Sequence, residues 1–138
     1  MWWIYFAYPQ GDRLVSQRLA ILWGYGHVFI FGAAAVYSAG VQVSIDYINN
    51  STDLGEKATA LAMCVPITIF VFVSWILLMR GQCSSHVNRA MAIAPILILG
   101  AAFLPGALQL AGLVMLGLVV AISLEPGAQR EKPEPVHP

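Results

Sequence analysis

The residues best suited to chemistry are His27 and two aromatic residues before it, Trp23 and Tyr25, in the string WGYGH. They open a long apolar run that holds no lysine or arginine before Tyr47, and its one carboxylate is Asp46. An ionisable ring in such a run is costly to bury, and it typically relays protons, binds a lipid headgroup or lines a substrate path. In the structural alternative, a neutral imidazole hydrogen-bonds another helix and holds the helices together. The sequence leaves both interpretations open.

A second polar pair, Gln42 and Asp46, stands near the far end of the same run. Residues four positions apart share one face of a helix, so these two side chains are predicted to lie together. They form a candidate wall of a vestibule for an ion or a polar solute. The alternative is that Asp46 is solvated at the membrane interface, because Asn49, Asn50 and Ser51 follow it directly. These polar neighbours favour the alternative.

Small residues in this run indicate how the helix packs. Gly24 and Gly26 either open the helix so that its backbone faces a ligand or allow a close helix crossing, and the crossing is favoured. Gly26, Ala33 and Gly40 recur every seven residues, which predicts a face where a neighbouring backbone approaches closely.

Common catalytic and cofactor motifs are absent from the sequence: it has no GxxxxGK[ST] loop, no GxSxG elbow, no HExxH string and no paired-carboxylate site. Its two cysteines, Cys64 and Cys83, are 19 positions apart, about 28 Å along a helix, which is beyond disulfide reach. The formal net charge is zero and the sequence has no basic tract of useful length, so we predict no nucleic-acid partner. We therefore predict no catalytic residue, no metal ligand and no cofactor.

The composition predicts an all-α, polytopic transmembrane helix bundle whose main partner is the lipid bilayer. Hydrophobic residues make up 59% of the chain and charged ones 10%, and the charges stand between the apolar runs rather than within them. The transmembrane segment 9–124 holds four predicted spans, at about 19–48, 58–79, 87–104 and 107–124. Residues 1–8 are expected to be the remnant of a preceding transmembrane helix, and 125–138, with four prolines, a disordered cytoplasmic tail.

The stretch from Ala90 to Leu124 is too long for one span, since a single helix would reach about 52 Å. The turn signal Pro105-Gly106 in its middle predicts a helical hairpin instead. With a hairpin, six of the seven basic residues fall on one side of the membrane, and Lys57 alone falls on the other. The positive-inside rule then places the C-terminus in the cytoplasm.

The WGYGH string, the small-residue run from Gly32 to Gly40 and the opening string WWIYF resemble the bacterial low temperature requirement A family. The motifs cover the chain to about Gly40, and the later helices share only the hydropathy. Members of that family are longer, with more transmembrane helices upstream, so this chain is expected to be a C-terminal part, completed by upstream helices or other protomers. Where the family often has an acidic residue after the opening string, this sequence has Ala7.

The resemblance implies a multi-pass protein of the bacterial inner membrane with a role in membrane adaptation or stress, and it names no reaction. Two alternatives of different class stand beside it. A component of a proton or solute pathway would use His27 with the Gln42 and Asp46 face. A membrane-embedded lipid-modifying or lipid-binding protein would use Trp23, Tyr25 and His27 at the cytoplasmic interface.

Overall fold

The regular structure of this protein is helical throughout the residues that its computed structural model describes, 1–5, 17–79 and 83–125. This confirms the all-α class. The elements, in chain order, are α1 (Trp2–Tyr5), α2 (Gln17–Ile48), α3 (Glu56–Ser74), a π-helical turn η2 (Trp75–Met79), α4 (Ser85–Ala101) and α5 (Ala107–Ser123).

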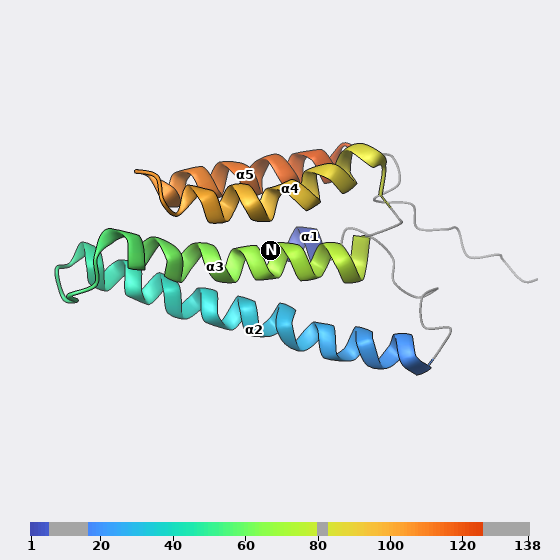
Figure 1. Ribbon diagram of the computed structural model, residues 1–138, viewed down its shortest axis with the longest axis horizontal. Coiled ribbons are helices and arrows are strands. Elements are labelled where there is room, and N and C mark those ends of the chain that lie inside the picture. The colour runs from blue at the N-terminus through green and yellow to red at the C-terminus, as the bar shows by residue number, and fades with distance from the viewer. Residues whose placement is uncertain (6–16, 80–82, 126–138) are drawn as a thin grey trace, which may run out of the picture.

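The helices form two antiparallel hairpins, α2 with α3 and α4 with α5 (Figure 1). α3 lies in the middle of the bundle, because it packs against α2 on one side and against α4 and α5 on the other. The short α1 contacts α5, where the Trp3 indole Nε1 donates to Ser123 Oγ at 2.9 Å.

The turn between α4 and α5 falls at Pro105-Gly106, as the hairpin interpretation predicts. Gly106 has φ 77°, a left-handed conformation that glycine adopts at little cost, and it is the N-cap of α5. α4 ends at Ala101, three residues before the end of the third predicted span at about 104. Residues 102–104 instead bond back three positions in a tightened turn, since the residue before a proline avoids the α conformation.

The face of small residues on α2 packs against α3. A Cβ added at Gly40 would lie 2.5 Å from the carbonyl oxygen of Ala62, and one added at Gly26 would meet the side chain of Leu77. Ala33, between them, is buried. The expected close approach of a neighbouring backbone is therefore confirmed at Gly40, whereas Gly26 meets a side chain. The same explanation is wrong for Gly24, where an added Cβ has nothing within 4 Å.

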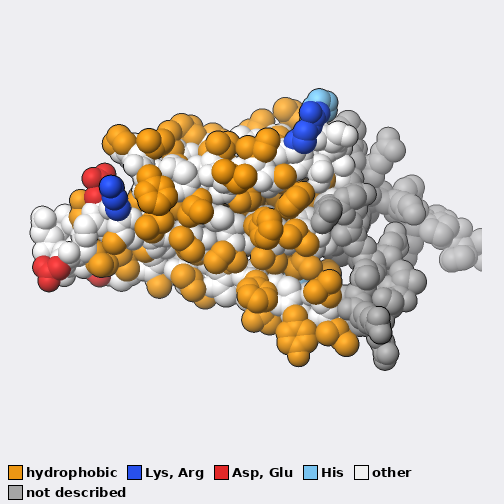
Figure 2. All heavy atoms as spheres, in the orientation of Figure 1, with side chains coloured by type: hydrophobic (Ala, Val, Ile, Leu, Met, Phe, Trp, Pro, Cys, Tyr) orange, Lys and Arg blue, Asp and Glu red, His pale blue; other side chains and the backbone are white. Residues whose placement is uncertain are grey.

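On the face shown in Figure 2, the described surface is mostly apolar over its middle, and the charged side chains that can be seen lie near its two ends. Two helical stretches, Ile21–Ile48 and Glu56–Met79, are long and apolar enough to cross a membrane. α4 and α5 have 17 residues each, about 25 Å, which is the lower limit for a span.

The predicted tail lies outside the described residues except for Glu125, whose carboxylate accepts a hydrogen bond from the backbone N–H of Ser84. Residues 6–8 of the predicted remnant of a preceding helix also lie outside them. The described part of that remnant packs into the bundle, because Ile4 is fully buried in the core.

Candidate functional site

His27 lies on the side of α2 that faces the bundle, and only 7% of it is exposed. Its Nδ1 atom is 2.6 Å from the backbone oxygen of Trp23. A carbonyl oxygen can only accept, so Nδ1 carries the proton and donates it, which leaves the lone pair of the neutral ring on Nε2. Nε2 is buried and has no hydrogen-bond partner within the described residues. The observed hydrogen bond is thus made within α2, and the expected bond to another helix is not found there.

Aromatic rings enclose the imidazole. The Trp23 ring centroid is 3.9 Å from that of His27, and the Tyr5 ring of α1 meets it edge-on at 5.6 Å. Trp23 Nε1 is also buried without a partner in the described part of the chain. This corner of the bundle therefore holds one unused N–H donor, on Trp23, and one unused nitrogen acceptor, on His27.

Tyr25 does not belong to this cluster. Its side chain is 70% exposed, because two residues along a helix turn it away from His27. Of the three residues that the sequence grouped, Trp23 and His27 are therefore neighbours in space and Tyr25 is not. Ligand binding by any of them stays a prediction.

Gln42 and Asp46 share a face as predicted, because Gln42 Nε2 donates to Asp46 Oδ1 at 2.9 Å. They are 15 and 19 positions beyond His27 on α2, and the structure does not bring them together with it. Neither residue lines the two cavities described next. The cavity at this end of α2 is lined from that helix by Ser44, Tyr47 and Ile48, and a vestibule walled by Gln42 and Asp46 stays a prediction.

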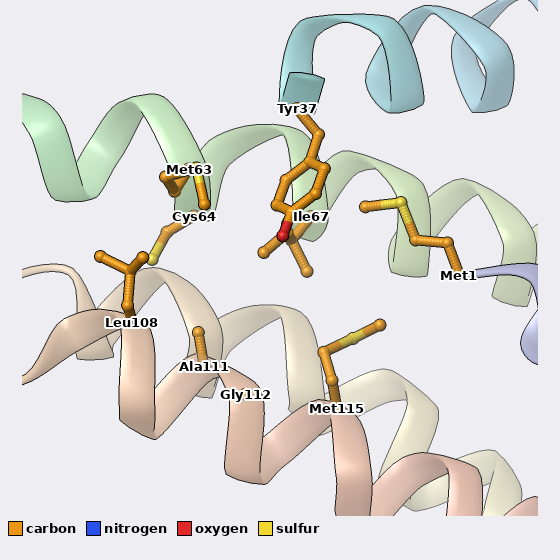
Figure 3. A pocket seen from close by; sticks show the side chains of 9 residues that line it. All are labelled: Met1, Tyr37, Met63, Cys64, Ile67, Leu108, Ala111, Gly112 and Met115. Atoms are coloured by element: carbon orange, nitrogen blue, oxygen red, sulfur yellow. The ribbon is translucent and has the colours of Figure 1, made fainter. Parts of the chain in front are cut away.

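The mid-bundle cavity has a volume of about 370 Å³ and lies between α2, α3 and α5 (Figure 3). In Figure 3 the Tyr37 side chain extends from α2 toward Ile67, and its hydroxyl is the polar tip among apolar and sulfur-containing side chains. The lining residues are Met1, Tyr37, Met63, Cys64, Ile67, Leu108, Ala111, Gly112 and Met115.

The turn-end cavity, of about 490 Å³, lies at the end of the bundle that carries both the 49–55 turn and the Pro105-Gly106 turn, between the end of α2 and the starts of α3 and α5. Its polar lining consists of Ser44 and Tyr47 from α2, Glu56, Lys57 and Thr59 from α3, and Gln109 from α5. Leu108 lines both cavities, so the two adjoin along the bundle.

Sequence reasoning missed Tyr37 and Ser44. Both lie on the side of α2 that faces the other helices, and Ser44 Oγ is buried without a partner among the described residues. The signal was available, because the two are seven positions apart and share a face with the small residues Ala33 and Gly40. With His27, these polar side chains extend over about 25 Å of the helix.

The described residues contain no group of three or more histidine, cysteine, aspartate or glutamate side chains that could hold a metal ion. The arrangement offers hydrogen-bonding groups and a single imidazole, placed along one side of one helix. This chemistry suits binding or passage of a polar group.

Comparison with known protein families shows which family the chain belongs to. The family model for the bacterial low temperature requirement A protein (LtrA) matches residues 1–125. The chain belongs to this family. The match extends well past Gly40, where the recognisable motifs end, so the family includes α3, α4 and α5. Neither the curated proteins nor the solved structures gave a match. Family membership and two helices long enough to cross a bilayer both fit a membrane protein.

Proposed function

We propose that this LtrA-family chain is a multi-pass protein of the bacterial inner membrane in which α2 lines a pathway for a proton or a small polar solute. Such a pathway would serve membrane adaptation or stress at low temperature. All four long helices cross the bilayer, with the 49–55 and Pro105-Gly106 turns in the periplasm and the C-terminus in the cytoplasm. Upstream helices or other protomers cover the exposed apolar side of α2.

One observation carries this proposal: two adjoining cavities extend along the polar side of α2, from one end of the bundle to its middle. The turn-end cavity holds the charged groups Glu56 and Lys57, and the mid-bundle cavity holds the Tyr37 hydroxyl. Beyond it along α2, His27 adds an imidazole whose Nε2 is buried without a hydrogen-bond partner among the described residues. Cavities and polar groups that follow one another along a membrane helix are typical of a transport pathway.

The lipid-binding alternative predicts a cavity open to lipid beside Trp23. Neither of the two cavities is lined by Trp23 or Tyr25. The exposed Tyr25 ring instead suits an anchor at the membrane interface, which any membrane helix can carry. The geometry therefore favours the pathway.

A pair of glycines on α5 allows a direct test. Gly112 lines the mid-bundle cavity, and a Cβ added there meets nothing within 4 Å, so Gly112→Leu fills the cavity without a backbone clash. Gly117 is equally open but lines neither cavity, so Gly117→Leu is the matched control.

The measurement is the decay of an imposed pH gradient in vesicles that contain the purified full chain and a pH-sensitive dye. We expect Gly112→Leu to slow the decay about tenfold and Gly117→Leu to leave it unchanged, because obstruction of a narrow path acts locally. A decay no faster than in protein-free vesicles, or equal effects of both variants, would contradict the proton pathway.

A further inference from the structure

The N-terminus of α5 forms part of the wall of the turn-end cavity, and its first amide groups have no backbone partner within the part of the chain that the structure describes. The first hydrogen bond of the helix joins Leu110 N–H to Gly106 O at 3.1 Å, so the three amides before it have no carbonyl within the helix. Gly106 is the N-cap and has no side chain to accept from them, and no acidic residue stands in the first turn. The positive end of a helix of 17 residues is therefore left without a negative partner on its own chain segment.

The cavity in front of these amides is large, and its wall is part polar and part apolar. Residues 105–109 form part of that wall, and the cavity volume of about 490 Å³ lies within the range of pockets that bind small molecules, roughly 300–1,000 Å³. A solute of metabolite size fits such a space. The cavity walls come from α2, α3, α5 and the turn before α5, so a bound solute would be held from several sides.

Two further groups belong to the same cavity: a hydroxyl, which suits a polar solute of either charge, and an ammonium group, which favours an anion. Ser44 lines the cavity, is only 9% exposed, and its hydroxyl is buried with no hydrogen-bond partner in the described residues. Lys57 lines it as well and brings a positive charge that can interact with an anion in any direction. Glu56 is the one carboxylate on the wall, and it stands in the first turn of α3, where it offsets the dipole of that helix and not of α5.

We infer that the turn-end cavity binds the oxyanion of a small solute, a carboxylate or a phosphate group. The first-turn amides of α5 donate to its oxygens, Lys57 supplies the countercharge, and the Ser44 hydroxyl donates a further hydrogen bond. Helix N-termini commonly bind anions in this way, and in membrane transporters they bind the anionic groups of substrates. An oxyanion would be the substrate class of the proposed pathway, and this role rests on the proposed function. The binding itself can be measured without any transport.

The most direct test is a substitution that adds a carboxylate of the protein itself to the site. Gly106→Asp adds a carboxylate at the N-cap of α5, where it bonds the free amides and repels a second anion. Gly106→Asn is the matched control, because both residues tolerate positive φ and an added Cβ comes no closer than 3.5 Å to Gln109 Oε1. Lys57→Gln and Lys57→Arg form a second pair that leaves the turn intact.

The first probe is inorganic phosphate, titrated calorimetrically into the purified full chain in an uncharged detergent at constant ionic strength. We expect saturable binding that Gly106→Asp weakens at least about tenfold and Gly106→Asn weakens less, because asparagine also accepts from the amides but adds no negative charge. Lys57→Gln should weaken it about fivefold to tenfold, and Lys57→Arg should preserve it. Binding by Gly106→Asp as tight as by the unchanged chain, or an unfolded Gly106→Asp variant with no effect of Lys57→Gln, would overturn the site.

The second probe distinguishes a lipid headgroup from a free solute. Nanodiscs of phosphatidylglycerol and of phosphatidylcholine are compared for the lipid retained by the chain after exchange into detergent. Retention of phosphatidylglycerol that Gly106→Asp abolishes, without binding of free phosphate, supports the oxyanion chemistry and identifies a lipid as its source. No binding of either probe overturns the inference. Phosphate binding without a pH-gradient decay leaves the anion site standing and contradicts the proton pathway alone.

Discussion

At the scale of the residue, His27 has one nitrogen occupied and one unused. The bond from Nδ1 to the Trp23 carbonyl fixes the ring against its own helix, and Nε2 is buried without a partner among the described residues. An unsatisfied buried acceptor costs about 1–3 kcal/mol. The ring contacts with Trp23 and Tyr5 offset part of this cost, and the free nitrogen is the group that a proton pathway would use.

We predict that His27→Phe folds normally but loses function. Phenylalanine keeps an aromatic ring against Trp23 and Tyr5 and removes the unsatisfied nitrogen, so the free energy of unfolding should change by less than about 1 kcal/mol. A ring that cannot titrate cannot carry a proton, so the pH-gradient decay in vesicles should fall to the protein-free rate. Unfolding in denaturant and vesicle flux are measured on the same preparation. A variant that folds and keeps its flux would remove His27 from the pathway.

At the scale of the element, close packing of α2 on α3 holds the polar side of α2 against the bundle. At Gly40 the backbones approach so closely that an added Cβ would lie 2.5 Å from Ala62 O. At Gly26 the contact is to the flexible Leu77 side chain, which belongs to the π-helical turn η2 and can adjust. The crossing is thus most sensitive at Gly40, seven positions from Ala33 and four from Ser44.

Gly40→Ala should destabilise the protein by about 1–3 kcal/mol, because the methyl group collides with backbone and the two helices must separate. Gly32→Ala is the control on the same helix, since an added Cβ there has nothing within 4 Å. That change should be neutral or stabilise by up to about 1 kcal/mol through helix propensity. Urea unfolding followed by circular dichroism measures both. Equal effects at the two glycines would mean that α2 and α3 do not pack as described.

At the scale of the whole molecule, the end of the bundle with the two turns carries Asp53, Glu56 and Lys57, and the opposite end carries His86 and Arg89. α2 leaves large apolar side chains exposed along its length, and only 17% of its most apolar 18-residue stretch is buried in the bundle. An uncovered surface of this kind is stable against lipid or against further helices, and unstable in water.

The proposed topology predicts that the two ends of the bundle face opposite sides of the membrane. In a Cys64→Ala, Cys83→Ser background, Ser51→Cys should react with a membrane-impermeant maleimide added outside intact cells. Ser85→Cys should react only after the cells are opened. Both serines are exposed, so reactivity reports the side of the membrane rather than burial. Labelling of Ser85→Cys from outside would reverse the orientation, and labelling of both would contradict the four spans.

The sequence by itself determined the helical class, the Gln42–Asp46 pair and the break at Pro105-Gly106. Each is encoded locally, in an unbroken apolar run, in a spacing of four residues and in the backbone limits of proline and glycine. It also placed His27 on a bundle-forming helix, through the small residues that follow at intervals of seven.

Only the tertiary structure decided which faces meet. Tyr5 reaches His27 because α1 folds back into the bundle, and Ser44, Lys57 and Gln109 line one cavity because two turns far apart in the sequence come to the same end. Periodicity specifies a face on each helix but not its partner, which depends on how all the helices pack together. For the same reason two glycines only two positions apart differ: Gly26 meets Leu77, while Gly24 faces open space.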